Sequence, residues 1–415
     1  MSRIRAFIAI LLIAVTVAGN ASCASNAKAS DLMHGVTPAK VNDVPPDNMF
    51  IGSTANFSLE LFKKSVKERE SSLISPLSVA LALSMAANGA GGTTLAQMEG
   101  LLGGEIPLPD LNEYLRGYTN RLPSESKSKF LIANSIWFRD NSDRLKVSPD
   151  FLQRNADYYG ADAYKSVFDS KTVKDINGWV NSNTDGMIKE ILDEIESKNM
   201  LFLINAIMFD AEWWNVYTKG NMVDGYFTDI GGTMVNAEYM RGAEYSYLDD
   251  GMATGFIKPY AGGVYSFAAL LPNKDVPISE YIDSLSGAGF LDTLKNAQHV
   301  LVTTTMPKFK YEFMLNMNDV LIALGMPDAF SIEDADFSKM ATSPEGNIYI
   351  SKVLHKTFIS VDELGTKAGA VTSVGSDSAG TSERPKDVRL DRPFVYAIID
   401  NATNLPIFIG AVLTV

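Results

Sequence analysis

The chain has 415 residues, of which 46% are hydrophobic and 20% charged, so it can bury a sizeable core and does not have the composition of a disordered protein. Its formal net charge of −13 and the lack of a basic run exclude a nucleic-acid-binding surface, because phosphate binding needs clustered Lys and Arg. One cysteine and three histidines leave little material for a metal cluster or a histidine-based active site.

The first residues have the pattern of an export signal. Two arginines precede an apolar run at residues 6–18, which is too short to span a bilayer. We therefore expect residues 1–22 to be a signal peptide and the mature protein to be extracellular or part of the cell envelope. Two alternatives remain for its start: Cys23 carries a lipid, which would be the only membrane anchor, or ordinary cleavage occurs near Ala24 or Ala29.

The next residues predict a linker followed by helices. Residues 23–48 are rich in Ala, Ser, Asn, Lys and Pro without periodicity, which predicts a flexible tether before a folded domain of residues 49–415. A helical pattern begins at Met49. Ser75 can cap a second helix, and residues 76–87 start with proline and are apolar almost all round, which is typical of a buried helix.

Further helical signals follow, and they are weaker. Thr94 and Gln97 fit a capping box for a helix that ends at Leu102. Residues 173–195 predict two helical pieces broken at residues 183–186. Two short helices are expected at residues 278–285 and 318–324.

Strand signals dominate the later part of the chain. Residues 201–209 form the most continuous apolar run of the mature chain, so we expect a strand that is covered on both faces at the centre of a sheet. Other strands are expected at residues 130–138, 255–257, 264–271, 300–313, 357–361, 394–399 and 406–415. Helices come early, strands come late and no βαβ repeat is evident, so the fold class is α+β.

The segment Glu363–Arg392 combines the composition of a loop with the alternation of a strand. Residues 365–378 contain no proline and almost nothing larger than valine. Five small side chains fall on one face of the alternation: Thr366, Ala368, Ala370, Thr372 and Val374. An ordered domain rarely contains so long a structureless connection unless it is functional, so we expect a functional loop that can become a strand.

Several segments, in this order along the chain, resemble the serpin family: SPLSVALALSMAANGAGGTTLAQM, INGWVNSNTDGMIKEIL, LINAIMFDAEW, MPKFKYEF, DVLIALGMPDAF, HKTFISVDELGTKAGA and DRPFVYAIIDNATNLPIFIGAV. The resemblance runs from about Asn48 to Val415. It implies a fold of three β-sheets with about nine helices, in which the long segment is an exposed reactive-centre loop. It also implies a protease inhibitor that is not an enzyme and that needs no cofactor or metal.

The resemblance assigns roles to individual residues. It places the hinge of the loop at Glu363, Gly365, Thr366, Ala368, Gly369 and Ala370. Lys308 resembles the lysine that pairs with the hinge glutamate, and Trp213 resembles the tryptophan beneath the top of the central sheet. The polar cluster where that sheet parts is represented by Ser75, Ser78, Asn205 and His355. Taken alone, the tryptophan, asparagine and histidine would be interpreted as ordinary core residues.

The implied activity is that of a suicide substrate, which traps the protease as an acyl-enzyme by inserting the cleaved loop into the central sheet. Proline is absent from the alternating face, which favours insertion. The spacing typical of serpins, counted forward from Gly365, implies a reactive bond at Ala379-Gly380, which suits an elastase-like or subtilisin-like serine protease. The same spacing counted backward from Pro393 implies Ser382-Glu383 instead. The expected partner is a serine protease in a covalent complex, with a cysteine protease as a second candidate, and the inhibitor is expected to be a monomer.

Two other function classes compete with this interpretation. A non-inhibitory serpin that acts as a carrier or binding protein is the main alternative, because a loop rich in Gly, Ala and Ser can simply be flexible. An enzyme finds little support: residues 124–127 match the S-x-x-K of penicillin-recognising hydrolases, but no K-T-G follows. The sequence also lacks G-x-S-x-G, P-loop and H-E-x-x-H motifs.

Overall fold

The computed structural model describes residues 29–122, 127–366 and 385–415. Several predicted features lie outside the described residues: the signal peptide, Cys23, residues 124–126, the hinge residues Ala368, Gly369 and Ala370, and both candidate reactive bonds, Ala379-Gly380 and Ser382-Glu383. Within the described residues, no helix is both long enough and apolar enough to cross a bilayer.

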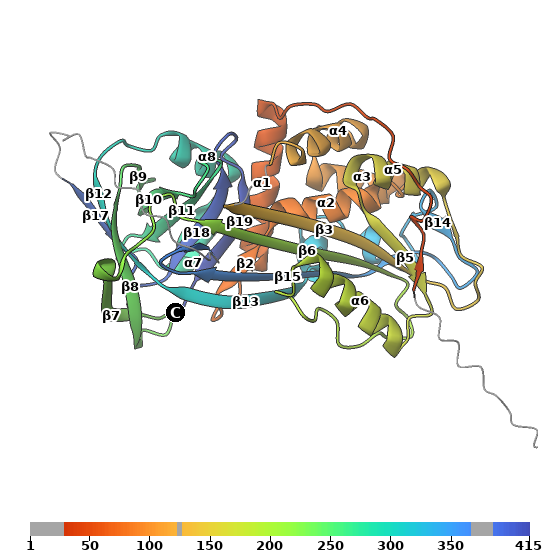
Figure 1. Cartoon of the computed structure of the whole chain (residues 1–415). Coiled ribbons are helices and arrows are strands. Elements are labelled where there is room, and N and C mark those ends of the chain that lie inside the picture. Colours follow the sequence, from red (N-terminus) through yellow and green to blue (C-terminus); the bar gives the residue numbers. More distant parts are fainter. Residues whose placement is uncertain (1–28, 123–126, 367–384) are drawn as a thin grey trace, which may run out of the picture.

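Three β-sheets organise the described fold (Figure 1). The central sheet has seven strands, in the order β1 (Ser30–Asp31), β5 (Asp162–Ser166), β3 (Ser128–Arg139), β6 (Leu201–Glu212), β16 (Gly365–Thr366), β15 (Ile350–Val361) and β13 (Phe309–Asn316). The six-stranded sheet has the order β2 (Ser72–Ile74), β19 (Pro406–Val412), β18 (Phe394–Asp400), β11 (Tyr265–Pro272), β10 (Ala253–Pro259) and β9 (Tyr247–Asp249). The four-stranded sheet has the order β17 (Lys386–Arg389), β12 (Val302–Pro307), β8 (Met234–Glu244) and β7 (Met222–Thr228), and β14 (Ala341–Thr342) pairs separately with β4 (Lys146–Val147).

Nine α-helices complete the described part of the chain. They are α1 (Asn48–Ser65), α2 (Pro76–Ala87), α3 (Gly92–Leu102), α4 (Leu108–Thr119), α5 (Pro149–Tyr159), α6 (Ser170–Asn183), α7 (Ile278–Ser284), α8 (Gly287–Lys295) and α9 (Asn318–Ala323). The predicted α+β class, with three sheets and about nine helices, is therefore confirmed.

Strand β6 is buried on both faces, as its apolar run predicts. Leu201 and Leu203 belong to the large core that also contains α2, whereas Phe202 and Ile204 belong to a second core with side chains from α6. Helix α2 is buried along its whole length, and it begins as predicted, with Ser75 as its N-cap and a proline in its first turn. The central sheet thus lies between α2 and α6.

The N-terminal segment, residues 29–47, lies along the body of the molecule, where we expected the flexible tether of residues 23–48. Its strand β1 pairs antiparallel with β5 and so forms one edge of the central sheet. Farther along, the backbone N–H of Ala39 donates to the carboxylate of Asp157 at 2.7 Å. The sequence of this segment shows no periodicity. Its conformation is set by partners that lie more than a hundred residues away in the chain.

The same segment passes closely over α4. Asp43 forms an ion pair with Arg121 at 2.8 Å. The carbonyl of Val44 lies so close to Gly117 that a Cβ at this glycine would be 1.9 Å from the carbonyl oxygen. Only glycine allows the backbone of the N-terminal segment to approach the helix this closely.

The predicted second helix within residues 173–195 is wrong, because the chain is not helical after α6 ends. The side chain of Asn177 accepts from the backbone N–H groups of Ile191 and Leu192 at 2.9 and 3.1 Å, and it donates to the carbonyl of Leu192 at 2.8 Å. These bonds satisfy backbone groups that a helix would otherwise pair, so the apolar residues pack in an irregular conformation.

The predicted capping box of α3 is also wrong. The helix has Gly91 as its N-cap, without a side-chain hydrogen bond. The hydroxyl of Thr94 accepts from the backbone of Asp336, and the amide oxygen of Gln97 accepts from the backbone of Asp328, both at 3.0 Å. These side chains therefore stabilise a distant loop, which local spacing cannot reveal.

The run at residues 300–313 forms two strands, where we expected one. β12 belongs to the four-stranded sheet and β13 to the central sheet. Pro307 ends β12 and has no N–H to continue the ladder, so the chain changes sheets at Lys308. This change of sheet places Lys308 at the junction of two sheets.

Candidate functional site

The start of the long loop is already a strand within the central sheet. β16 lies between β6 and β15 and is antiparallel to both, with Thr366 opposite Ala211 on one side and Val361 on the other. Farther along, residues 201–206 of β6 pair directly with residues 350–356 of β15, and there the two strands are parallel. The loop therefore enters the sheet at the point where these two strands separate.

Two residues fix the geometry of this entry. Thr366 is 2% exposed, and its hydroxyl lies 2.5 Å from that of Tyr260. Its side chain thus occupies the face that the alternation assigns to burial. A Cβ at Gly365 would lie 2.0 Å from the carbonyl oxygen of Ala211, so only glycine fits between the strands here.

The turn before β16, residues 362–364, is held by three hydrogen bonds from one neighbouring segment. The indole N–H of Trp213 donates to the carbonyl of Asp362 at 2.9 Å, and its backbone N–H donates to that of Leu364 at 2.9 Å. The backbone N–H of Tyr217 donates to the carbonyl of Glu363 at 2.9 Å. We call residues 362–364 the hinge turn.

Lys308 and Glu363, which the resemblance pairs, form an ion pair with Nζ and Oε2 2.7 Å apart. Lys308 also contacts Glu238 of β8 at 3.1 Å. The hydrogen bond from Lys308 lowers the pKa of Glu363, so this carboxylate stays charged at neutral pH. The lysine at the junction of two sheets therefore binds the hinge turn to the four-stranded sheet.

A buried polar cluster links β6 to β15 farther down the sheet. The Nε2 of His355 accepts from the backbone N–H of Ser75 at 3.1 Å, so its proton is on Nδ1, which donates to Asn205 Oδ1 at 2.8 Å. The amide of Asn205 donates to the carbonyl of Ser78 at 2.9 Å and to the side chain of Asn134 on β3. Burial lowers the pKa of His355 to about 3, so the imidazole is neutral.

This cluster spans the two strands that an inserting loop would separate. His355 and Asn205 are direct partners in the ladder between β15 and β6. The hydroxyl of Ser75 donates to the carbonyl of Ile407 in β19 at 2.8 Å, which links the cluster to the six-stranded sheet. Among the described residues, the hydroxyl of Ser78 has no partner. Four of the predicted residues therefore lie together in one place.

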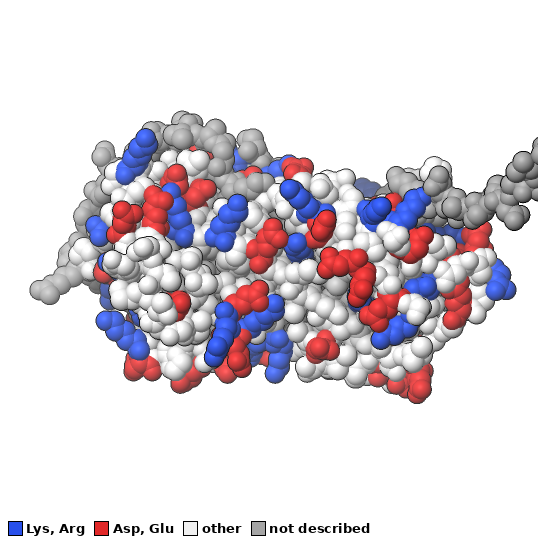
Figure 2. Space-filling model, turned by 90° about the horizontal axis from the view of Figure 1, so that it is seen from below, with Lys and Arg blue, Asp and Glu red and all other residues white. Residues whose placement is uncertain are grey.

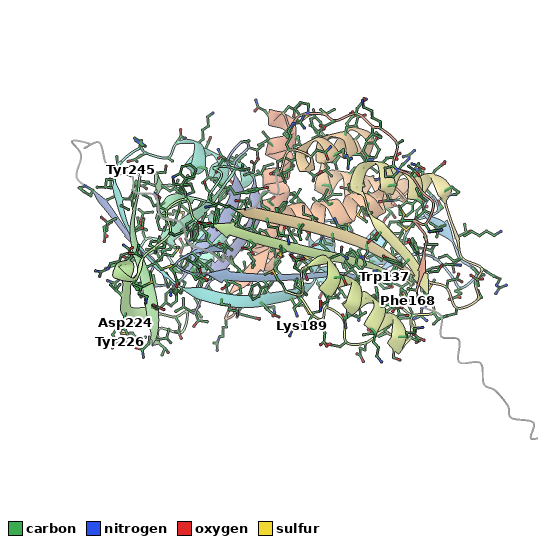
Figure 3. The ribbon with its side chains drawn as sticks, in the orientation of Figure 1. Trp137, Phe168, Lys189, Asp224, Tyr226 and Tyr245 are labelled. Atoms are coloured by element: carbon green, nitrogen blue, oxygen red, sulfur yellow. The ribbon has the colours of Figure 1, made fainter. Side chains whose placement is uncertain are left out.

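Helix α6 covers the outer face of the central sheet through a core of its own. Trp137 of β3 stacks on Tyr164 with ring centroids 4.4 Å apart, and Phe168 stacks on Phe202 at 4.8 Å. Figure 3 shows Trp137 and Phe168 beside α6. The same core includes Leu354 of β15. Separation of β6 from β15 therefore has to shift this core.

Sequence reasoning missed three residues of the site. Tyr260 packs flat on Trp213, with ring centroids 4.5 Å apart, and reaches Thr366. Asn134 completes the polar cluster, and Tyr217 holds the hinge turn. Asn134 lies within β3, Tyr260 follows the end of β10 and Tyr217 lies in the connection after β6, and no sequence spacing marks any of them.

The described residues do not contain a group of three His, Cys, Asp or Glu side chains that could hold a metal ion. Figure 2 shows acidic and basic side chains interspersed over the face in view. The described part of the site therefore consists of the entry of β16, the hinge turn and the buried polar cluster.

Comparison with known proteins identifies the family. The family model described as serpin (serine protease inhibitor) matches residues 52–415. An uncharacterised serpin-like protein of Thermococcus kodakarensis is 27% identical over 372 residues, which cover 88% of this chain and 85% of that protein.

Solved structures agree with this match. The native state of the thermophilic serpin tengpin is 53% identical in sequence and has a TM-score of 0.90. The match covers 94% of this chain and 100% of the tengpin chain. Its latent state is 52% identical, has a TM-score of 0.80 and covers 90% of this chain and 100% of its own. The chain therefore belongs to the serpin family.

Proposed function

We propose that this serpin is an irreversible suicide-substrate inhibitor of a serine protease. The observation that carries the proposal is the position of Thr366, which is buried between β6 and β15 in the register that further insertion would continue. The side chains that would follow it on the same face, at residues 368, 370, 372 and 374, are no larger than valine.

Insertion of the cleaved loop into the central sheet would supply the free energy that drives inhibition. The protease nucleophile attacks a loop carbonyl and forms an acyl-enzyme, and cleavage releases the loop from its downstream anchor. The loop then replaces a parallel pairing of β6 and β15 with two antiparallel ones, which are slightly more stable per residue. On the order of a dozen backbone hydrogen bonds at about 1 kcal/mol each would release about 10 kcal/mol. This is comparable to the stability of a whole domain.

The same movement would inactivate the protease. The acyl-enzyme is attached to the cleaved loop, so insertion pulls the protease along the central sheet. A displacement of about 1 Å within a catalytic triad can slow a reaction by about a hundredfold. Deacylation then stalls, and the covalent complex persists.

The target follows from the proposed reactive bond. Ala379-Gly380 suits an elastase-like or subtilisin-like protease with a small apolar specificity pocket, and Ser382-Glu383 is the alternative bond. A cysteine protease is a second candidate partner. We propose that the inhibitor acts as a monomer outside the cell or in its envelope, to which a lipid on Cys23 would attach it.

Incubation of the purified mature protein with subtilisin and with pancreatic elastase tests the function. We expect a complex that resists boiling in SDS, and a released C-terminal fragment that begins at Gly380. A fragment that begins at Glu383 would select the alternative bond. Complete loop cleavage by every serine protease tried, with no SDS-resistant complex, would overturn the proposal.

The proposed export requires a separate experiment. Intact-mass analysis of the protein recovered from its native host shows whether residues 1–22 are removed and whether Cys23 carries acyl chains. A cytoplasmic protein that retains residue 1 would contradict export. A mature chain that starts near Ala24 or Ala29 would support export without a lipid anchor.

A further inference from the structure

A buried ion pair lies behind the hinge turn. Lys258 of β10 and Glu244 of β8 have side chains that are 3% and 7% exposed, and Nζ lies 2.8 Å from Oε1. Charged side chains are almost never buried to this extent unless they are paired, and even a paired burial seldom adds net stability. Stability alone therefore gives a weak reason for this pair.

The ammonium group of Lys258 makes all its other described contacts to one short segment. Nζ donates to the carbonyl of Asn215 at 3.1 Å. It also lies over the aromatic rings of Trp213 and Tyr217, 5.3 and 4.5 Å from their centroids. One cation thus fixes the beginning, middle and end of residues 213–217, which we call the hinge clamp.

Burial by itself would lower the pKa of Lys258, but the Tyr217 hydroxyl and the Glu244 carboxylate raise it overall. The ammonium therefore stays charged at neutral pH. A charged group of this kind both donates to the Asn215 carbonyl and attracts the two aromatic faces, whereas an apolar side chain of equal length could only fill the space.

The hinge clamp in turn holds the hinge turn. Within the described part of the chain, the three hydrogen bonds to the carbonyls of residues 362–364 come from Trp213 and Tyr217. A continuous path of contacts therefore runs from Glu244 through Lys258 and the hinge clamp to the residues directly before β16. The hinge turn is the point about which the cleaved loop has to fold into the sheet.

We propose that Lys258, oriented by Glu244, is a positioning residue for loop insertion. It keeps the hinge clamp rigid, so that the hinge turn directs the cleaved loop between β6 and β15. This role deepens the proposed inhibitory function and rests on it. Insertion competes with deacylation, so a loose hinge turn gives the protease more time to hydrolyse the acyl bond and escape.

The test compares three variants with the wild type. Lys258→Met removes the ammonium and keeps the chain length. The double variant Glu244→Met with Lys258→Met replaces the pair by apolar side chains and so leaves no charge unpaired, which usually restores stability. Lys165→Met is the matched control. Lys165 lies on β5, away from the hinge turn, and its ammonium pairs with the buried carboxylate of Asp140 at 3.1 Å.

Three quantities are measured for each protein: the moles of inhibitor consumed per mole of protease blocked, the rate of loop cleavage, and the thermal midpoint before cleavage. We expect Lys258→Met and the double variant to raise the moles consumed by about threefold or more, the usual size for a residue that biases a two-state element. The rate of loop cleavage should not change. Lys165→Met should lower the thermal midpoint and leave the moles consumed unchanged.

Each result separates positioning from packing. If the double variant recovers the wild-type thermal midpoint but still consumes more inhibitor, the pair positions the hinge turn. If the double variant consumes no more inhibitor per protease than the wild type, the proposal is overturned. This holds even if Lys258→Met alone, which leaves Glu244 unpaired, consumes more. A wild type that forms no covalent complex would refute the inhibitory function itself. In that case the positioning role of Lys258 is tested by the rate at which the thermal midpoint rises after loop cleavage. A slower rise in Lys258→Met than in the wild type supports the role, and an equal rate overturns it.

Discussion

His355 shows how one buried side chain makes the central sheet sensitive to pH. Its Nε2 accepts from a backbone N–H while its Nδ1 donates to Asn205, so only the neutral ring satisfies both contacts. Protonation would turn Nε2 into a donor that faces another donor at Ser75. The contact that links β15 to the N-terminus of α2 would then be lost.

The pKa of His355 is lowered from 6.5 to about 3 by burial, so the unfolded chain binds more protons than the folded chain between these values. The free energy of unfolding should therefore fall as pH drops below about 6.5, by up to about 1.4 kcal/mol per pH unit. Thermal midpoints at pH 7 and pH 5 should differ more for the wild type than for His355→Gln. The exposed His299 supplies the control, since His299→Gln should retain the full wild-type difference.

Thr366 offers a residue-scale test of insertion. Thr366→Arg would place a charge on the buried face beside Tyr260, where the wild-type hydroxyl bonds. We expect the variant to become a substrate, cleaved at the wild-type rate but without a covalent complex. Thr303→Arg makes the same change at an exposed position of β12 and should inhibit normally. An undiminished complex with Thr366→Arg would contradict the insertion mechanism.

At the scale of elements, the N-terminal segment and α4 share one close contact. Replacement of a helical glycine by alanine usually stabilises a helix by about 1 kcal/mol. At Gly117 we expect the opposite sign, because the added Cβ would lie 1.9 Å from the carbonyl oxygen of Val44.

Thermal unfolding of four chains measures this effect. We expect Gly117→Ala to lower the thermal midpoint in the full chain and to raise it in a chain that lacks residues 29–47, because the deletion removes Val44. The deletion alone should lower the midpoint, since it removes β1 and the ion pair of Asp43 with Arg121. Destabilisation of similar size in both backgrounds would show that Val44 is not the cause.

The elements differ in how far the sequence predicts them. The apolar run of β6 and the Ser75 cap of α2 are local patterns, and both are confirmed. The N-terminal segment, the irregular chain after α6 and the sheet change at Lys308 depend on partners far along the chain, so composition and period could not predict them.

The candidate site divides in the same way. The resemblance to serpins named Glu363, Lys308 and His355, and these residues make the contacts described above. The pair of Lys258 and Glu244 was not predicted, because an isolated lysine and glutamate in β-strands normally indicate solvent-facing positions.

At the scale of the whole molecule, the proposed loop insertion would rearrange the central sheet and the core under α6. A gain of about 10 kcal/mol on insertion would raise the thermal midpoint by about 12 °C, because the unfolding entropy of a chain of this size is about 0.9 kcal/mol per kelvin. Limited proteolysis within residues 367–384, followed by thermal unfolding, measures the gain. A cleaved chain with an unchanged midpoint would favour a carrier or binding protein, because a loop that does not insert cannot trap a protease.

The pairing of β2 with β19 sets the order in which the molecule can assemble. These strands lie more than 330 residues apart, yet they are neighbours in the six-stranded sheet, and β19 also pairs with β18. Contacts between such distant residues form slowly, because a very long loop must close first. The six-stranded sheet cannot close before residues 406–412 have been synthesised, so residues 367–384 are synthesised before this sheet is complete. The fold can therefore be completed only at the end of synthesis, and the folding rate depends on how fast β18 and β19 pair with the rest of the sheet.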